Sequence, residues 1–169
     1  TGHVIALGTF SKILAPGFRT GSTLAHPEII DKIVVAKQAT DLCTPAILQL
    51  IIAQYMSEGL LDKNLVATIE MYREKRELML SCFREYMPEG VTWTEPEGGL
   101  FLFLTLPEGM DAQKLFMVAI ENKVAFVLGT AFYCNGGGLN TMRLNFSYPT
   151  KEQIVDGIQR LAKAIKDYK

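Results

Sequence analysis

An apolar stretch near the start of the chain, Val4-Ile5-Ala6-Leu7, limits the possible folds more than any other feature. An uninterrupted apolar run of this kind is typical of a strand that is buried on both faces, as in parallel sheets, where each strand lies beside others. Only one more short strand, at about Gly21 to Ala25, is expected before Gly59. We therefore expect the first part of the chain to be an incomplete piece of a larger sheet.

Two helices are predicted in this first part. Pro27 suits the first position of a helix that runs to about Thr40. A second helix is expected to begin at Thr44-Pro45, with the Thr44 side chain as its cap, and to end at Gly59. Its residues from Ala46 to Met56 are apolar nearly all round. Such a helix is expected to lie at the centre of a larger body or to be covered by another subunit.

The second part of the chain alternates strands and helices after one long helix. Helical periodicity runs from Leu60 to Met87, with a charged face that is most simply solvated. Asp111 and the Thr150-x-x-Gln153 pattern are typical of helix starts. Strands are expected at residues 91–94, 100–106, 124–128 and 141–146, with helices at 111–122 and after Thr150. The sequence therefore predicts an α/β protein that divides near Gly59 into parts 1–59 and 60–169.

Composition excludes several classes of function. Seventeen basic against 18 acidic residues give a net charge of −1, which excludes a strongly basic nucleic-acid binder and a polybasic membrane anchor. No apolar run reaches the ~20 residues of a membrane span, and the amino terminus lacks the basic flank of a signal peptide. Cys43, Cys82 and Cys134 suit a reducing cytosol, with Cys82 packed on an apolar helix stripe. His3 and His26 lack metal-ligand spacing. We expect a cytoplasmic protein without a metal site, a membrane partner or, in this region, a nucleic-acid partner.

The segment from Gly8 to Gly21 carries the strongest chemical signal. It places Thr9, Ser11 and Lys12 at the carboxyl end of a predicted strand, where open α/β sheets bind ligands. A dry setting and the nearby Arg19 would lower the pKa of Lys12, as a Schiff-base lysine requires, and hydroxyls with a guanidinium suit a phosphate. On spacing alone, a solvated surface loop explains the same residues equally well.

Four blocks together resemble one enzyme family. The pattern Ser11-Lys12-x-x-x-Pro16-Gly17-x-Arg19-x-Gly21 is similar to the lysine motif of fold-type I, class I/II aminotransferases that use pyridoxal 5'-phosphate. Further matches lie at residues 37–42, 96–101 and 142–147, in family order, and resemble the 2-aminoadipate and kynurenine aminotransferase subgroup and MocR-type regulators. The resemblance implies the carboxyl-terminal part of this α/β fold: the end of the large-domain sheet, a connecting helix and a small domain.

The resemblance also assigns roles to residues. It implies that Lys12 forms a Schiff base with pyridoxal 5'-phosphate and moves the substrate proton, while Thr9, Ser11 and Arg19 hold the cofactor phosphate. Thr9 stands where the family often has serine and keeps the hydroxyl.

Two further positions receive substrate roles. The resemblance implies that Arg143 binds the α-carboxylate of the substrate, and that Gly98 and Gly99 let backbone approach it. An ordinary strand arginine and a plain strand-entry turn are the alternatives.

The implied function is amino-group transfer between amino acids and 2-oxo acids in a homodimer. The family's first half, which supplies most of the large-domain sheet and the group that pairs with the cofactor ring, cannot be placed in this chain. We therefore expect the isolated chain to be inactive. The main alternative is the effector domain of a MocR-type transcription regulator, and a lyase or decarboxylase on the same fold is a third.

Overall fold

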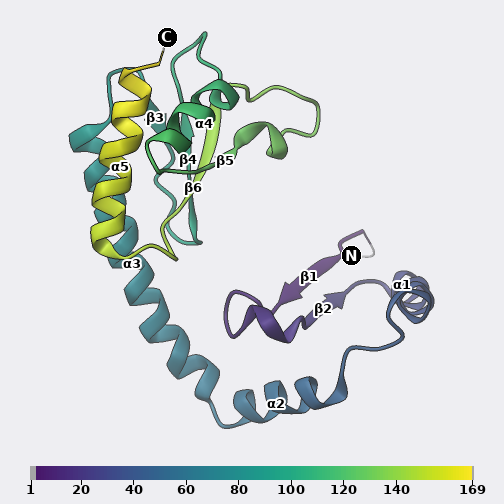
Figure 1. Cartoon of the computed structure of the whole chain (residues 1–169). Helices are drawn as coiled ribbons and strands as arrows, with labels where there is room; N and C mark the ends of the chain where they lie inside the picture. The colour runs from purple at the N-terminus through teal and green to yellow at the C-terminus, as the bar shows by residue number, and fades with distance from the viewer. Residues whose placement is uncertain (1–2, 169) are drawn as a thin grey trace. The chain divides into compact units, whose positions relative to one another are not determined.

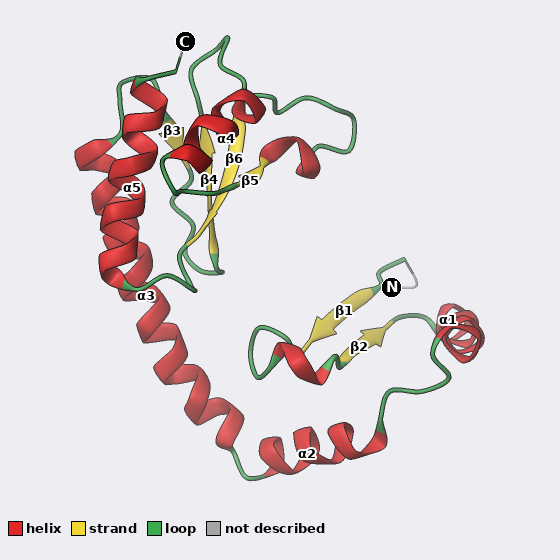
Figure 2. Ribbon diagram, viewed as in Figure 1, coloured by secondary structure: helices red, strands yellow, loops and turns green. Residues whose placement is uncertain are grey.

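The computed structural model describes residues 3–168, which form two compact units that meet within one long helix, between Thr68 and Ile69. The elements follow one another along the chain in the order shown in Figure 1, and Figure 2 distinguishes helices from strands. The division by contacts falls inside the helix, and the domain boundary predicted near Gly59 stays a prediction.

The first unit begins with a two-stranded antiparallel hairpin. Strand β1 (Ala6–Thr9) pairs with β2 (Gly21–Leu24), and the short helix η1 (Pro16–Phe18) lies in the loop between them. All four β1 residues are exposed, and the side chain of Leu7 is 79% exposed. The prediction of a buried strand is therefore wrong for the described residues, because nothing in this part of the chain covers the hairpin.

Helices α1 (Pro27–Thr40) and α2 (Ala46–Ser57) follow, and then the long helix α3 (Leu60–Tyr86) begins. Pro27 opens α1 as predicted. Thr44 does not cap α2, since the cap position is Pro45 and the Thr44 carbonyl instead accepts a hydrogen bond from the Gln49 side chain at 2.9 Å.

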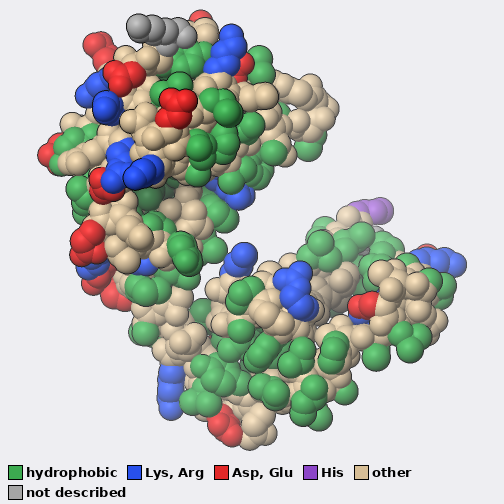
Figure 3. All heavy atoms as spheres, in the orientation of Figure 1, with side chains coloured by type: hydrophobic (Ala, Val, Ile, Leu, Met, Phe, Trp, Pro, Cys, Tyr) green, Lys and Arg blue, Asp and Glu red, His purple; other side chains and the backbone are tan. Residues whose placement is uncertain are grey.

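Helix α2 is apolar nearly all round, yet it buries only Ile52. Ile47 and Leu50 are 63% and 66% exposed, and Figure 3 shows many hydrophobic side chains on the visible surface of the first unit. The sequence predicts that other parts of a larger body or another subunit pack on this helix, and the described residues do not bury it in this way.

The second unit is a four-stranded antiparallel sheet with helices packed on it. The strands are β3 (Thr92–Trp93), β4 (Phe101–Thr105), β5 (Val127–Leu128) and β6 (Thr141–Asn145), in the spatial order β3-β4-β6-β5. The helices are the second part of α3, α4 (Ala112–Glu121) and α5 (Lys151–Lys166), and η2 (Gly129–Phe132) follows β5.

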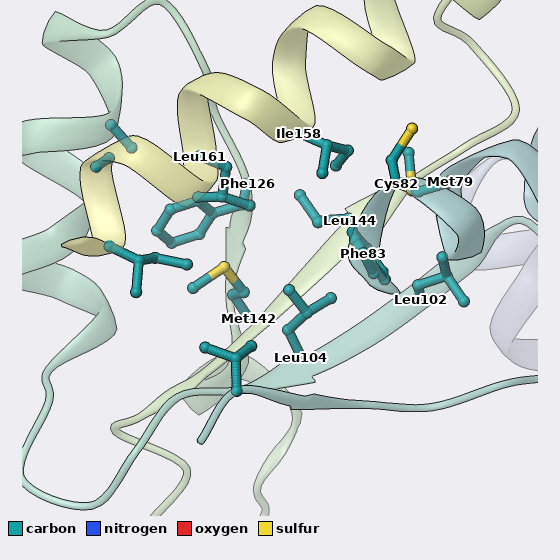
Figure 4. Packing of buried hydrophobic residues seen from close by; sticks show 14 of the residues in the cluster. Met79, Cys82, Phe83, Leu102, Leu104, Phe126, Met142, Leu144, Ile158 and Leu161 are labelled. Carbon is teal, nitrogen blue, oxygen red and sulfur yellow. The ribbon is translucent and has the colours of Figure 1, made fainter. Parts of the chain in front are cut away.

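Alternation along β4 and β6 gives the sheet one buried face and one open face. Leu102 and Leu104 in β4, and Met142 and Leu144 in β6, pack with the apolar residues of the helices (Figure 4). Cys82 of α3 belongs to this core, and only 3% of its surface is exposed, which confirms its predicted packing. The residues between these positions lie on the opposite face of the sheet, since successive strand residues point to opposite faces.

Both predicted caps in the second unit are confirmed. The Asp111 carboxylate accepts the Gln113 amide at 2.7 Å. At α5, Thr150 Oγ1 accepts the Gln153 amide at 3.2 Å while the Gln153 side chain accepts the Thr150 amide at 2.9 Å. Strand β5 is shorter than predicted, because the Val124 amide still donates to the Ala119 carbonyl at the end of α4.

Within the described residues there is no helix that is long and apolar enough to cross a membrane, and no cluster of acidic, histidine and cysteine side chains that could hold a metal ion.

Candidate functional site

The first group of predicted site residues lies on the loop of the β1–β2 hairpin. The Phe10 amide donates to the Thr20 carbonyl at 3.1 Å and closes the loop, and Thr9 stands opposite Gly21. A Cβ atom at Gly21 would lie 2.7 Å from the Gly8 carbonyl oxygen, so glycine permits this close pairing. The closure brings Thr9 and Arg19 to the two sides of the loop base.

Lys12 lies in a tight turn that starts directly after β1. The amides of Leu14 and Ala15 both donate to the Phe10 carbonyl, at 2.9 and 3.1 Å, and the Ser11 amide donates to Thr9 Oγ1 at 3.1 Å. Lys12 itself is exposed. The dry setting predicted for its amine is therefore not found in the described residues.

Arg19 turns the chain back toward β2. Its backbone is left-handed (φ 50°, ψ 35°), which is uncommon for a residue with a long side chain. The guanidinium Nη1 donates to the Pro16 carbonyl at 3.3 Å, and no other partner of this side chain occurs in residues 3–168. The remaining donors of Arg19 are therefore free to bind an anion.

The structure thus gathers one amine, two hydroxyls and a guanidinium on a single exposed loop. Arginine and hydroxyl donors are suited to a phosphate group, and an accessible amine is suited to an aldehyde. The donor set of Thr9, Ser11, Lys12 and Arg19 therefore fits a ligand that carries both groups, as pyridoxal 5'-phosphate does.

The second group lies on the open face of the sheet in the second unit. Arg143 stands in β6 between the buried residues Met142 and Leu144, and it pairs with Phe103 of β4 and Val127 of β5. Its side chain is therefore directed away from the core and is half-buried.

Two aromatic rings flank the Arg143 guanidinium. Its central carbon, Cζ, lies 3.9 Å from the centroid of the Phe101 ring and 4.6 Å from that of the Phe132 ring. Both distances are within the range of a cation–π interaction. This setting differs from that of a strand arginine that extends freely into solvent.

The hydrogen-bond donors of Arg143 lack partners within the described part of the chain. Its Nε is buried without an acceptor, and no hydrogen bond or ion pair of its terminal nitrogens is found there. Arg76 also has a buried Nε without a partner, but its Nη1 donates to the Pro96 carbonyl at 2.8 Å and its Nη2 pairs with Glu77. A buried N–H group without an acceptor is costly, and the terminal nitrogens of Arg143 are free to donate, so Arg143 is well suited to bind a carboxylate.

The predicted glycines lie in the loop that enters β4. Gly99 has a φ of 85°, which favours glycine, and a Cβ atom added there would have no neighbour within 4 Å, as is also true of Gly98. Backbone conformation alone explains Gly99 in this chain, and its contact with substrate stays a prediction.

Several residues that surround or position the site are not predicted from the sequence. Phe101 and Phe132 flank Arg143, and only the alternation of Phe101 with Leu102 gave a signal, because it places that ring on the open face. Lys75 and Arg76 of α3 donate hydrogen bonds to the carbonyls of Ser147 and Pro96, which belong to two of the blocks that resemble the family. No local pattern indicates these long-range contacts.

Comparison with known proteins identifies the family of the chain. A family model described as aminotransferase class I and II matches residues 1–161. An aromatic-amino-acid aminotransferase of Thermococcus litoralis is 50% identical over 166 residues, which cover 98% of this chain and 40% of the relative. An HTH-type transcriptional regulator of Bacillus subtilis is 27% identical over 166 residues, or 34% of its length. The regulator alternative is therefore the less supported of the two.

Solved structures share the fold over nearly the whole chain. The crystal structure of a multiple substrate aminotransferase from Thermococcus profundus is 50% identical with a TM-score of 0.95, covering 99% of this chain and 41% of that one. An α-aminoadipate aminotransferase from Thermus thermophilus, complexed with N-(5'-phosphopyridoxyl)-L-leucine, is 43% identical with a TM-score of 0.91, over 96% of this chain and 42% of that one. The chain thus spans about 40% of the length of these relatives.

Proposed function

Because this chain belongs to the class I and II aminotransferase family, we propose that it forms part of an enzyme that transfers amino groups from amino acids to 2-oxo acids with pyridoxal 5'-phosphate. The observation that carries this proposal is the β1–β2 loop, which presents one amine together with two hydroxyls and a guanidinium. The phosphopyridoxyl group bound to the Thermus thermophilus relative supports the same cofactor.

In this proposal, residues of the hairpin hold both the phosphate end and the aldehyde end of the cofactor. Arg19 and the hydroxyls of Thr9 and Ser11 bind the phosphate, whose two negative charges favour charge-assisted hydrogen bonds. Lys12 would hold the aldehyde end through Nζ and, once the substrate's amino group had replaced it there, the freed amine would accept and return the substrate proton. When bound, pyridoxal phosphate supplies an electron sink for the substrate's α-carbon.

Arg143 has a separate task, which is to bind the substrate's α-carboxylate. A planar guanidinium matches a carboxylate in bidentate fashion, and a β-strand fixes the direction of the side chain. The free donors of Arg143 support this role, and its place in β6 keeps it apart in sequence from the hairpin. Gly99 would allow backbone to approach the same substrate.

We further propose that the enzyme is a homodimer whose remaining sheet and partner subunit cover α2 and the hairpin. The exposure of Leu7, Ile47 and Leu50 supports this, since large apolar side chains are rarely left in water together. We accordingly expect that the 169-residue chain, prepared alone, does not turn over amino acids. Transaminase activity that copurifies with this chain would contradict that expectation.

The cofactor assignment can be tested on the chain as it stands. Pyridoxal 5'-phosphate is added, the mixture is reduced with borohydride, and labelled lysines are identified by peptide mass spectrometry. We expect Lys12 to be labelled at lower cofactor concentration than Lys32, an exposed lysine of α1 that serves as the internal control. Replacement of Arg19 by Gln should remove this preference, because the phosphate would lose its charged partner. Equal labelling of Lys12 and Lys32 in the unchanged chain would refute the assignment.

A further inference from the structure

We propose that Phe101 and Phe132 are positioning residues, which hold the Arg143 guanidinium between their rings and thereby fix the direction of its carboxylate-binding edge. The inference rests on the proposed role of Arg143 and adds two residues to which no role is assigned from the sequence. It concerns only the second unit.

The two rings reach Arg143 from different elements. Phe101 opens β4 and pairs with Asn145, so it is a diagonal neighbour of Arg143 on the open face of the sheet. Phe132 ends the short helix η2, which follows β5. The Cζ–centroid distances of 3.9 Å and 4.6 Å place the guanidinium against both rings.

Contact with ring faces restricts the guanidinium without occupying its donors. The N–H groups of arginine lie in the plane of the guanidinium, whereas attraction by an aromatic face acts on the cation as a whole. No hydrogen bond or ion pair orients Arg143 in residues 3–168, so stacking on the two rings is a contact that can limit its rotation. A long side chain that is held before binding loses less rotamer freedom when the ligand arrives.

The position of Phe132 is itself determined by close packing. Gly129, the first residue of η2, is buried against Thr141 of β6, and a Cβ atom there would lie 2.8 Å from the Thr141 carbonyl carbon. The Phe132 ring also meets the Phe103 ring edge-on, with centroids 6.0 Å apart. The ring is therefore supported by both the glycine contact and a neighbouring aromatic side chain.

The orientation of the guanidinium can be observed by NMR in the 169-residue chain. Protons that lie over an aromatic face are shifted upfield, so the Arg143 Nε–H and Cδ protons should show this shift. Phe132→Leu should reduce this upfield shift, whereas Phe132→Tyr, which keeps an aromatic ring, should retain it. Tyr133→Leu is the matched control, because Tyr133 is adjacent and 42% exposed against 45% for Phe132, yet its ring does not stack on the guanidinium.

Binding is then measured with 3-phenylpropionate as the carboxylate probe and 3-phenylpropan-1-ol as the counterpart without a carboxylate. We expect Phe132→Leu and Phe101→Leu to weaken binding of the carboxylate by about fivefold, the order expected for one cation–π contact. Binding of the alcohol should change by less than about twofold, since it makes no bidentate pair with arginine. A purely structural role would change both ligands alike.

The outcomes separate this inference from the function on which it rests. If the carboxylate does not shift Arg143 resonances in the unchanged chain, the proposed role of Arg143 fails. If it does, but Phe132→Leu leaves its affinity unchanged, weakens both ligands equally or is matched by Tyr133→Leu, only the positioning role is overturned.

Discussion

Replacing Gly129 by alanine tests the packing that supports the substrate face. A Cβ atom at this position would lie 2.7 Å from the Thr141 Cβ and 2.8 Å from its carbonyl carbon, and rotation of a side chain cannot relieve a clash with backbone. Thr141 is buried, and its hydroxyl donates to the Gly138 carbonyl at 2.7 Å. The added methyl group must therefore separate η2 from β6 or displace this hydroxyl.

The expected loss of stability follows from these two effects. Overpacking a well-packed site costs about 1–3 kcal/mol, and loss of the Thr141 hydrogen bond adds about 1 kcal/mol. The substitution should therefore lower the free energy of unfolding by about 2–4 kcal/mol. For a urea m value of about 2 kcal/mol/M, which is typical of a small protein, the midpoint should fall by about 1–2 M.

Trp93 provides the assay. It is the single tryptophan, it lies in the second unit, and its ring centroid is 5.4 Å from that of the buried Phe83. Its fluorescence in a urea titration therefore reports unfolding of this unit. Because Phe132 belongs to the displaced segment, the upfield shift of the Arg143 protons should decrease in the same variant.

Gly157→Ala is the matched control. Gly157 lies inside α5, and a Cβ atom there would have no neighbour within 4 Å. Alanine is favoured over glycine in a helix interior by about 0.5–1 kcal/mol, so this variant should be more stable than the original chain. If both substitutions change stability in the same direction, the argument from close packing at Gly129 is refuted.

Three further predictions concern the helices of the second unit. Thr150→Ala removes the hydrogen bond that Thr150 Oγ1 accepts from the Gln153 amide and should lower stability by about 1 kcal/mol in the same titration, whereas an unchanged midpoint would show that this side-chain cap is not needed. Lys151 donates to Glu74 at 2.7 Å, which lowers the pKa of Glu74 from 4.5 and raises the pKa of Lys151 from 10.5. The ion pair therefore stabilises the fold fully between these two pH values, and its contribution is lost as the pH falls below 4.5 or rises above 10.5. In Lys151→Met, this contribution should be absent from both the acid and the alkaline side of the pH–stability curve. An unchanged curve on both sides would contradict the assignment. Burial raises the pKa of the Cys82 thiol. A disulfide reagent should therefore modify the two exposed cysteines rapidly and Cys82 only after urea unfolding. Rapid modification of all three cysteines would contradict the packing of Cys82 in the core.

The chemical identity of the hairpin residues could be predicted from the sequence, but their surroundings could not. The resemblance of residues 8–21 to a family motif implies that Thr9, Ser11, Lys12 and Arg19 form a phosphate-binding loop, and the structure places all four on one hairpin. The buried setting predicted for Lys12 depends on elements that would cover it, and the described residues do not include them.

The sequence by itself determined the features that depend on neighbouring residues. Pro27 opens α1, and Asp111 and Thr150 cap α4 and α5, because a cap involves only side chains and amides within one helical turn. Alternation along β4 and β6 likewise separated the buried face from the open one.

Only the tertiary structure decided the pairing of strands and the surroundings of Arg143. Phe101, Phe132 and Arg143 meet because β4, β5 and β6 adopt one register and η2 packs against Thr141. Such contacts depend on residues that are far apart in the chain, and their energy arises from complementary shape and charge, which no local pattern encodes.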